Sequence, residues 1–462
     1  MSIPGLGQLL PQPTASTTRI VALKRLSEWR FDASRSSSTG VKVRLISGTA
    51  ERDGTELALN KTYTFVRTKS KILTWSGCTL EISGESEDYV TDFPVAEDSP
   101  MVSYLNLHFE LQAQRKAAAN ATRRNRPGPR VMVCGPQNSG KTSLVRMLAA
   151  LSTKMGGQPL VANLDPGEGL LSLPGTVSAA VFGNVMDIEE PAGGFGVGST
   201  PSSGPSAVPV KLPIVYYFGR EKVQDDVALW KDLTSKLASS VRAKFGEDDE
   251  VRSAGLVLDT PVATTNQSDI DSLVHAAREF AVNIVVVLGS ARIESTLQQI
   301  LGQEKTSFGE PISVIMLDQS EGVAARDNDF IKSIREASIK EYFFGDSKRT
   351  LSPSTQSVSF DDVAIFKTPD EEEGYETPPV GQVLEPAEIT AGMSHWTLAV
   401  MDASVNDPPE TIRQAPVIGF IAVADVDEDR RRLKILSPVT SRLGNKPLVW
   451  GRWPEPYINL LG

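Results

Sequence analysis

The first part of the chain alternates apolar and polar residues with a period of two. The alternation runs from Thr18 to about Glu110 and is clearest in VKVRLIS (41–47), TYTFV (62–66) and CTLEIS (78–83). Successive side chains of a strand point to opposite faces of a sheet, so this pattern predicts strands with one buried face. Turn residues separate the runs, as is typical of antiparallel strands. We therefore expect a small antiparallel β-sandwich.

A helical period follows the sandwich. The segment YLNLHFELQAQRKAAANATRR, residues 104–124, carries apolar residues at helical spacing and ends in polar and basic residues. This pattern predicts a helix that connects two domains, and we place the boundary near residue 118.

The middle of the chain alternates almost continuous apolar runs with helical patterns. The runs are VMVCG (131–135), PLVANLD (159–165), GLVLDT (255–260), NIVVVLG (283–289) and ISVIMLD (312–318). Strands that are apolar on both faces belong to parallel sheets, because the crossover helices cover both faces. The pattern predicts a doubly wound, mostly parallel α/β domain.

The last part of the chain is again rich in strand patterns. VIGFIAVADV and RLKILSPV, joined by DEDRR, predict a hairpin. A Gly-, Ser- and Pro-rich stretch at 191–209 predicts a mobile insertion within the α/β domain. The expected organisation is a disordered N-terminus (1–17), the sandwich with its connecting helix (18–118), the α/β domain (119–345) and a C-terminal β-rich α/β domain (346–462).

Composition and charge exclude several classes of protein. The content of 40% hydrophobic and 23% charged residues is that of a globular chain. The net charge of -10 argues against coating nucleic acid through the overall field, so any RNA contact would be local. Cys78 and Cys134 lie in apolar runs, which suits core thiols in a reducing compartment such as the nucleus or cytosol. No run of about 18 apolar residues is present, so we expect no membrane-spanning helix.

The strongest motif is a phosphate-binding loop. RVMVCGPQNSGKTSLVRML joins an apolar strand, the motif G-x-x-x-x-G-K-T and a helix, which is the context that the motif requires. Lys141 would reach the β and γ phosphates, and the Thr142 hydroxyl would occupy one magnesium position. The predicted nucleotide contacts are Gln137, Asn138, Ser139, Gly140, Lys141, Thr142 and Ser143.

Two strands end in an aspartate that is suited to the same magnesium ion. Asp165 ends the strand after the loop helix, and we favour it for the metal or its water shell; Asp259 remains an alternative. The two Asn-Lys pairs continue as NKTY and NKPL and lack the aspartate of the guanine-recognition element N-K-x-D, so ATP is preferred to GTP. His108, His275 and His395 are scattered along the chain and lie near no cysteine, so we expect none of them to bind a metal.

These segments together resemble the polyribonucleotide 5′-hydroxyl-kinase (Clp) family over nearly the whole chain. The resemblance rests on the domain order and on GTELALNKTYTF, GPQNSGKTSL, NLDPGEG, VLDTP and SIKEYFFG. It is closest to the fungal branch that forms a subunit of cleavage factor IA in pre-mRNA 3′-end formation. Active family members transfer the γ-phosphate of ATP to the 5′-hydroxyl of RNA.

The family's roles transfer to this chain position by position. The resemblance assigns Lys141 and Thr142 to the nucleotide, and Asp165 to the metal side and to activation of the attacking hydroxyl. Arg326 corresponds to the first of two lid arginines that contact the transferring phosphate. The resemblance also implies that an acidic residue and a lysine of the sandwich lie near the adenine. The matching residues are Glu28 and Lys69, each of which could equally be a surface charge.

Three departures from the family pattern fall on the transfer chemistry. The T-x-G-W clasp of active members reads Thr260 to Ala263 here and lacks both Gly and Trp; a stacking aromatic contributes about 1–3 kcal/mol per base. Ile331 occupies the second lid position, and loss of a phosphate-clamping arginine can cost roughly a thousandfold in rate. Glu168 stands where active members tend to have glutamine.

The resemblance therefore implies a nuclear interaction protein that holds ATP and Mg²⁺ as a structural ligand. Its implied partners are the Pcf scaffold subunit and other 3′-end processing subunits; any RNA contact would be weak or indirect. The alternative is an active RNA 5′-hydroxyl kinase, in which the basic segment TRRNRPGPR (122–130) lines an RNA path. A small P-loop GTPase would explain NLDP but not the flanking β domains.

Overall fold

The computed structural model describes residues 18–33, 40–121, 126–189, 213–345, 350–368, 384–438, 445–456 and 460. The predicted disordered N-terminus and the predicted mobile insertion lie outside these residues. The chain forms two compact units, a first that ends at Pro94 and a second that begins at Val95, with Asp53–Thr55 belonging to the second. None of the described helices is long and apolar enough to cross a membrane.

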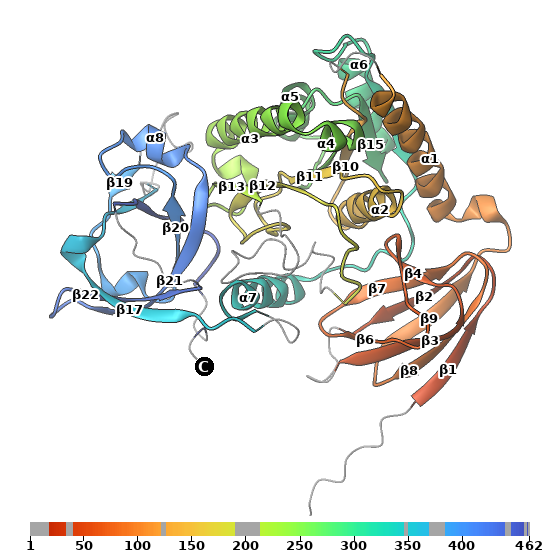
Figure 1. Cartoon of the computed structure of the whole chain (residues 1–462), viewed down its shortest axis with the longest axis horizontal. Helices are drawn as coiled ribbons and strands as arrows, with labels where there is room; N and C mark the ends of the chain where they lie inside the picture. Colours follow the sequence, from red (N-terminus) through yellow and green to blue (C-terminus); the bar gives the residue numbers. More distant parts are fainter. Residues whose placement is uncertain are drawn as a thin grey trace, which may run out of the picture. The chain divides into compact units, whose positions relative to one another are not determined.

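The first unit is the predicted antiparallel β-sandwich, shown in red and orange in Figure 1. One sheet has the order β1-β8-β3-β6 and the other β5-β4-β7-β2-β9. Trp29 and Phe31 of β2 stack with their ring centroids 4.4 Å apart, and Phe65 of β6 lies 5.0 Å from Phe31. The strands are β1 (Thr18–Leu23), β2 (Ser27–Asp32), β3 (Val41–Gly48), β4 (Glu51–Arg52), β5 (Thr55–Glu56), β6 (Thr62–Phe65), β7 (Lys69–Thr74), β8 (Cys78–Ser83) and β9 (Glu87–Asp92).

The second unit contains the predicted doubly wound sheet, with the order β13-β12-β11-β14-β10-β15-β16. The strands from β11 to β16 in this order run parallel, and β12 and β13 extend the sheet as an antiparallel edge. The strands are β10 (Arg130–Cys134), β11 (Leu160–Asn163), β12 (Thr176–Val181), β13 (Ile214–Tyr217), β14 (Leu256–Asp259), β15 (Ile284–Leu288) and β16 (Ser313–Leu317).

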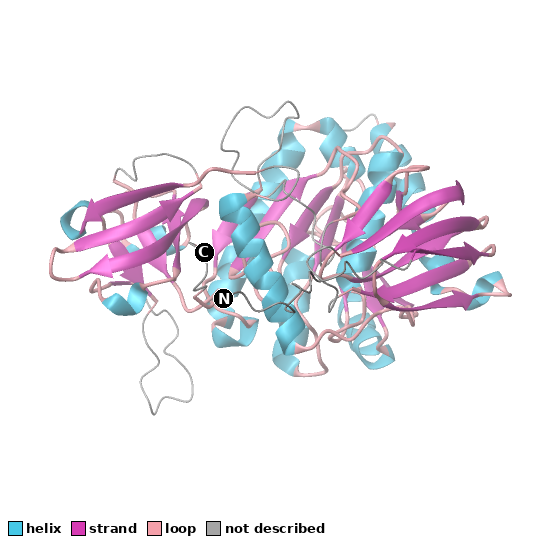
Figure 2. Cartoon of the chain, turned by 90° about the horizontal axis from the view of Figure 1, so that it is seen from below, coloured by secondary structure: helices cyan, strands magenta, loops and turns pink. Residues whose placement is uncertain are grey.

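Helices cover both faces of this sheet, as Figure 2 shows. Helices α3, α5 and α6 share one hydrophobic cluster with Met132 and Leu258, whereas α1 and α2 contact the sheet separately. This two-sided cover explains why the sequence of the strands is almost continuously apolar. The helices are α1 (Pro100–Ala119), α2 (Lys141–Lys154), α3 (Val227–Glu247), α4 (Asp249–Ala254), α5 (Gln267–Glu279), α6 (Ala291–Leu301) and α7 (Asn328–Phe344).

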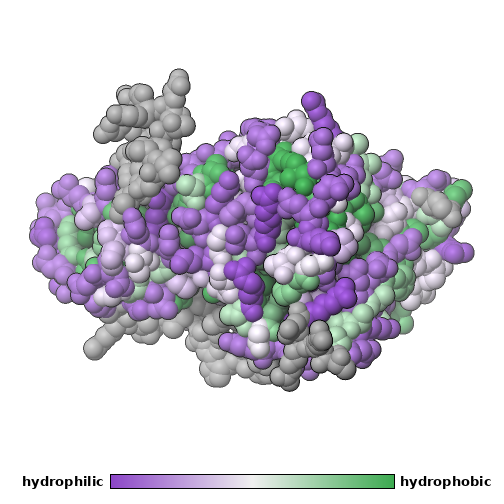
Figure 3. Space-filling model, turned by 90° about the horizontal axis from the view of Figure 1, so that it is seen from above, coloured by the Kyte–Doolittle hydropathy of each residue, from purple (hydrophilic) through white to green (hydrophobic). Residues whose placement is uncertain are grey.

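A third, β-rich sheet follows with the order β17-β22-β21-β20-β23-β18-β19. The predicted hairpin is confirmed, because β21 and β22 pair antiparallel. The elements are β17 (Ser354–Ser359), β18 (Ile365–Lys367), β19 (Glu385–Pro386), β20 (Thr397–Met401), α8 (Pro409–Arg413), β21 (Val417–Asp427), β22 (Arg432–Ser437) and β23 (Leu448–Trp450). The surface seen in Figure 3 is mainly hydrophilic, with small separate apolar areas.

The β-rich part is joined to the central sheet by buried polar contacts around Tyr217 at the end of β13. The Tyr217 hydroxyl donates a hydrogen bond to the carbonyl of Trp453 (2.9 Å) and accepts one from the amide of Gly451 (3.1 Å). Arg335 of α7 pairs with Glu455 at 2.7 Å and lies 4.4 Å from the Trp453 ring centroid. Residues from both regions form one hydrophobic cluster, so their folding is expected to be coupled.

Replacing Tyr217 by Phe should lower the free energy of unfolding by about 1–3 kcal/mol, because two buried backbone groups lose their partner. The matched control is Tyr216→Phe on the same strand, whose hydroxyl bonds the half-buried Ser240 hydroxyl at 3.1 Å. Ser240 can turn to water, so this control should cost less. Urea unfolding of both variants measures the difference, and equal losses would contradict the assigned role of Tyr217.

Candidate nucleotide-binding site

The predicted phosphate-binding loop connects β10 to α2 in the expected strand-loop-helix arrangement. Gly140 immediately precedes the helix with φ 87°, a left-handed conformation that favours glycine. A Cβ atom at Gly135 would lie 2.6 Å from the carbonyl oxygen of Leu288, so any side chain there would collide with β15. Both glycines of the motif are therefore required by the backbone itself.

Lys141 is folded back over the loop. Its ammonium donates hydrogen bonds to the carbonyls of Pro136 (3.2 Å) and Gly135 (3.4 Å), and the side chain is buried. The side chains of Gln137 and Ser143 are exposed, whereas Ser139 is buried. The loop thus directs a positive charge and the first amides of α2 to one place, which is the arrangement that binds phosphate.

Asp259 meets the loop helix directly. Because β14 lies between β10 and β11, Asp259 is paired with Val133 on one side and Asn163 on the other. The Thr142 hydroxyl donates a hydrogen bond to Asp259 Oδ2 at 2.7 Å. Sequence reasoning treated Asp259 only as the alternative aspartate, whereas the strand order makes it the neighbour of Thr142.

Asp165 follows β11, one strand further from the loop. Burial raises the pKa of Asp165 to about 7, with the nearby negative charge of Glu168 adding to the effect. Burial also raises the pKa of Asp259 to about 6, while Lys141 and Thr142 oppose the increase. Two desolvated carboxyl groups near one lysine make a site in which an added cation would be stabilised.

Two buried polar atoms fit a magnesium nucleotide. Ser139 Oγ and Asp259 Oδ1 are both buried without a hydrogen-bond partner. In the described part of the chain, no group of three or more His, Cys, Asp or Glu side chains could hold a metal by itself. Magnesium is usually held by one or two carboxylates together with phosphates and water, so this donor set suits Mg²⁺ with a nucleotide.

The segment that replaces the family's clasp is fixed against the sheet. The Thr260 hydroxyl donates to the carbonyl of Val133 (2.9 Å), and the amide of Ala263 donates to the carbonyl of Gly135 (3.1 Å). The hollow beside it, lined by Val262, Ala263 and Trp230 among others, measures about 10 Å³, which is room for about one water molecule. Trp230 is itself buried and offers no free stacking face.

The structure brings Arg326 together with Glu168, a pairing that the sequence did not indicate. Arg326 Nη1 lies 2.9 Å from Glu168 Oε2, although the residues are 158 positions apart. Ile331 lies in the first turn of α7, whose N-terminus is capped by Asp327. The arginine and the glutamate that the resemblance singled out separately therefore form one ion pair.

The two predicted adenine-site charges lie on adjacent strands of the sandwich. Glu28 is fully buried and accepts hydrogen bonds from Arg30 Nε (2.8 Å) and Lys71 Nζ (2.6 Å). Lys69 pairs instead with Asp32 at 3.2 Å. The reading of Glu28 as a surface charge is wrong; its contact with a nucleotide, like that of Lys69, stays a prediction.

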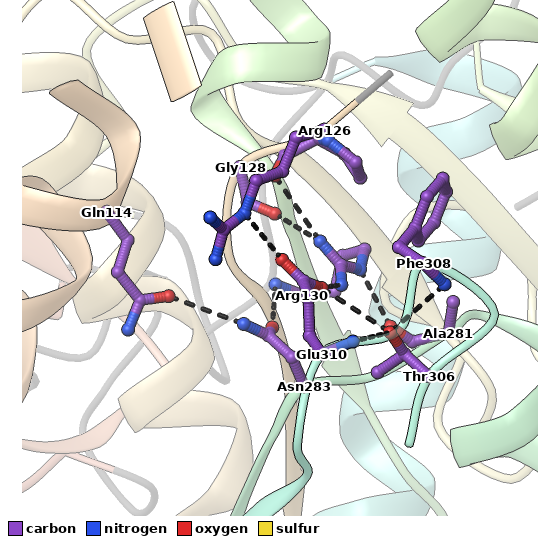
Figure 4. A network of polar contacts seen from close by, with 10 residues as sticks. Gln114, Arg126, Gly128, Arg130, Ala281, Asn283, Thr306, Phe308 and Glu310 are labelled. Carbon is purple, nitrogen blue, oxygen red and sulfur yellow. Dashed lines mark hydrogen bonds and ion pairs between the residues drawn. The ribbon is translucent and has the colours of Figure 1, made fainter. Parts of the chain in front are cut away.

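The described arginines of the basic segment have structural partners. Arg126 and Arg130 both pair with Glu310, and Arg130 also donates to the carbonyls of Ala281 and Gly128, each at 2.7 Å (Figure 4). Arg130 is buried, so it is not exposed to an RNA backbone. Arg123 and Arg124 lie outside the described residues.

Three family models match successive parts of the chain. They are described as the N-terminal beta-sandwich domain of polyadenylation factor (residues 22–118), the mRNA cleavage and polyadenylation factor CLP1 P-loop (135–345) and the Pre-mRNA cleavage complex II protein Clp1 (351–455).

Similar proteins and structures extend over nearly the whole chain. The mRNA cleavage and polyadenylation factors CLP1 of Chaetomium globosum and clp1 of Neurospora crassa are 59% and 54% identical, each over 100% of both chains. A solved wild-type Clp1p–Pcf11p complex is 28% identical, with a TM-score of 0.83 over 95% of this chain and 98% of that chain. A second structure, with a TM-score of 0.81 at 28% identity over 95% of this chain and 99% of that chain, is described as showing an extended Pcf11p–Clp1p interface and the basis for ATP loss in a point mutant. The chain belongs to the CLP1 family of mRNA cleavage and polyadenylation factors.

Proposed function

We propose that this CLP1-family protein holds ATP and Mg²⁺ as a structural ligand and binds a Pcf11-type scaffold in the nuclear pre-mRNA cleavage machinery. The observation that carries the proposal is a contrast within the site. On the nucleotide side, Lys141, Thr142 and Asp259 are in place. On the acceptor side, where an RNA 5′-hydroxyl would bind, the Gly and Trp of the clasp are missing and Arg326 is in an ion pair.

The choice of ligand follows from the loop and from the relatives. The partnerless Ser139 Oγ and Asp259 Oδ1 support a magnesium nucleotide at the loop. A related structure is described in terms of ATP loss in a mutant, which supports ATP as the nucleotide. In this proposal Gln137, Asn138, Ser139, Gly140, Lys141, Thr142 and Ser143 hold the phosphates.

Magnesium would be held by Thr142 with the two aspartates. Asp259 already accepts the Thr142 hydrogen bond, and Asp165 adds a second carboxyl group whose pKa is raised by burial and by Glu168. A bound Mg²⁺ supplies positive charge at the terminal phosphates. Asp165 could then contact the ion or a water of its shell.

Absence of phosphoryl transfer is proposed from the acceptor side. Ala263 is buried and Val262 is 39% exposed, so this segment presents no aromatic surface to an RNA base. The hollow beside it does not fit a base. The alternative function, an active RNA 5′-hydroxyl kinase using Asp165, Lys141 and Arg326, is supported by a carboxyl group with a pKa of about 7, which suits a general base.

The partner follows from the solved relatives. Structures 28% identical to this chain contain or describe a Pcf11p–Clp1p interface, which supports a Pcf scaffold subunit as the partner here. Nuclear localisation follows from participation in mRNA 3′-end processing. A nucleotide bound only to the folded protein stabilises it and could therefore support the scaffold-binding surface.

Replacing Lys141 and Thr142 by Ala should remove bound ATP and the stability that it provides. At a thousandfold excess of ligand over Kd the loss would be about 4 kcal/mol. Thermal unfolding with and without MgATP, together with a pull-down by the scaffold subunit, measures both effects. Lys154→Ala, an exposed lysine at the other end of α2, is the matched control. Unchanged melting and unchanged scaffold capture would refute the structural-ligand proposal.

The raised aspartate pKa values predict a pH effect on the nucleotide-free protein. Folded Asp165, with a pKa of about 7, binds protons more readily than an unfolded aspartate of pKa about 3.9, so the free energy of unfolding falls as pH rises between these values. Asp165→Asn removes the ionisation. Its stabilising effect should therefore be about 2.5 kcal/mol larger at pH 8 than at pH 5.

Urea unfolding in EDTA at the two pH values checks this difference. The control is Asp429→Asn, in the exposed turn between β21 and β22, which should have the same effect at both. If Asp165→Asn behaves like the control, the carboxyl group is not desolvated as described.

Incubation with RNA separates the two functions. The purified protein is mixed with excess 5′-hydroxyl RNA and Mg²⁺, then denatured, and the released nucleotide is identified by chromatography. We expect intact ATP at near one per chain and no new 5′-phosphate. ADP together with phosphorylated RNA, absent from a Lys141→Ala control, would establish the kinase instead.

A further inference from the structure

We propose that Glu168 is a positioning residue that competes with the terminal phosphate of bound ATP for Arg326, and so weakens the preference of the site for ATP over ADP. The inference rests on the proposed function, because it requires a nucleotide at the phosphate-binding loop. It assigns to an acidic residue of this chain a part in nucleotide discrimination.

The ion pair joins two segments that border the site. Glu168 lies in the turn after β11, three positions beyond Asp165, and Arg326 lies just before α7. Arg326 Nη1 lies 2.9 Å from Glu168 Oε2. The Arg326 side chain is 25% exposed and the Glu168 side chain 37% exposed. A partly exposed pair of this kind is weak in water, so a phosphate can displace the carboxylate.

Both members act on the charges of the nucleotide site. Glu168 is among the groups that raise the pKa of Asp165 and of Asp259, and Arg326 is among those that lower the pKa of Asp259. The ammonium of Lys141 lowers the pKa of both aspartates. The pair therefore lies within electrostatic reach of the groups that would surround the terminal phosphates.

The segment that carries Arg326 begins at a contact with the phosphate-binding loop and ends at the start of α7. Gln319 Nε2 donates a hydrogen bond to the carbonyl of Asn138 in the phosphate-binding loop at 2.8 Å. At the other end, the carboxylate of Asp327 accepts a hydrogen bond from the amide of Phe330 at 2.8 Å and caps α7. The Gln319 contact thus holds the start of the segment that carries Arg326 beside the phosphate-binding loop.

The choice of anion bears on ATP more than on ADP. An arginine already paired with a carboxylate gives up part of its interaction with phosphate. Only ATP carries a γ-phosphate, which Lys141 would reach together with the β-phosphate. Removal of the Glu168 charge should therefore strengthen ATP binding selectively, and the gain should require Arg326.

The test is a double-mutant cycle on the full-length protein. Dissociation of mant-ATP and mant-ADP, chased with unlabelled nucleotide in Mg²⁺, is measured for wild type, Glu168→Gln, Arg326→Gln and the double variant. We expect Glu168→Gln to slow mant-ATP release about fivefold and to change mant-ADP release less than about twofold. In the Arg326→Gln background the slowing should disappear. Glu321→Gln, an exposed acid on the same segment, is the matched control and should leave both rates unchanged.

Three results would overturn the proposal. Equal slowing of mant-ATP and mant-ADP release, or no slowing, would show that Glu168 does not discriminate between the nucleotides. Slowing that persists without Arg326 would show that Glu168 acts through its own charge. Failure of the wild-type protein to bind either nucleotide would overturn the proposed function and this inference together. This outcome differs from failure of the inference alone, because it is seen in the wild type without any variant.

Discussion

The nucleotide site depends on β14 lying between β10 and β11 in a parallel sheet. Parallel strands bring their carboxyl ends to one edge, so the phosphate-binding loop, Asp259 and Asp165 leave the sheet side by side. The hydrogen bond from Thr142 to Asp259 exists only because these strands are neighbours. Distant segments of sequence thus contribute to one site once the sheet has formed, and no single segment contains it.

The parts that could be read from the sequence are those set by local patterns. Alternation with period two predicted the sandwich, apolar runs with helices predicted the parallel sheet, and the loop motif predicted the role of Gly140. Strand order is a long-range property, so the sequence alone favours Asp165 and does not place Asp259 beside Thr142. The Glu168–Arg326 pair spans 158 positions, and no spacing rule could indicate it. Lys71 rather than Lys69 meets Glu28 because the antiparallel register of β2 and β7 places Lys69 opposite Asp32 and Lys71 two residues closer to Glu28.

The chain buries carboxylates in two different ways. Glu28 lies in the sandwich with Arg30 and Lys71 on its two oxygens, so its charge is compensated within the protein. Asp165 and Asp259 have raised pKa values because burial outweighs the help from Lys141. Buried charge without compensation costs stability, so it persists where a ligand completes the charge balance. Carboxylate side chains are therefore neutralised by cations of the protein in the sandwich, whereas at the phosphate-binding loop they are prepared for an added cation.

The contacts around Tyr217 have a practical consequence for dissecting this protein. A fragment that ended after α7 would retain every strand of the nucleotide-binding sheet, yet it would expose the Tyr217 hydroxyl and the Arg335 guanidinium that Trp453 and Glu455 now cover. The shared hydrophobic cluster would lose its second half at the same time. A fragment that ends after α7 would thus be less stable and prone to aggregation. The shortest useful fragment of the second unit therefore has to extend past Glu455.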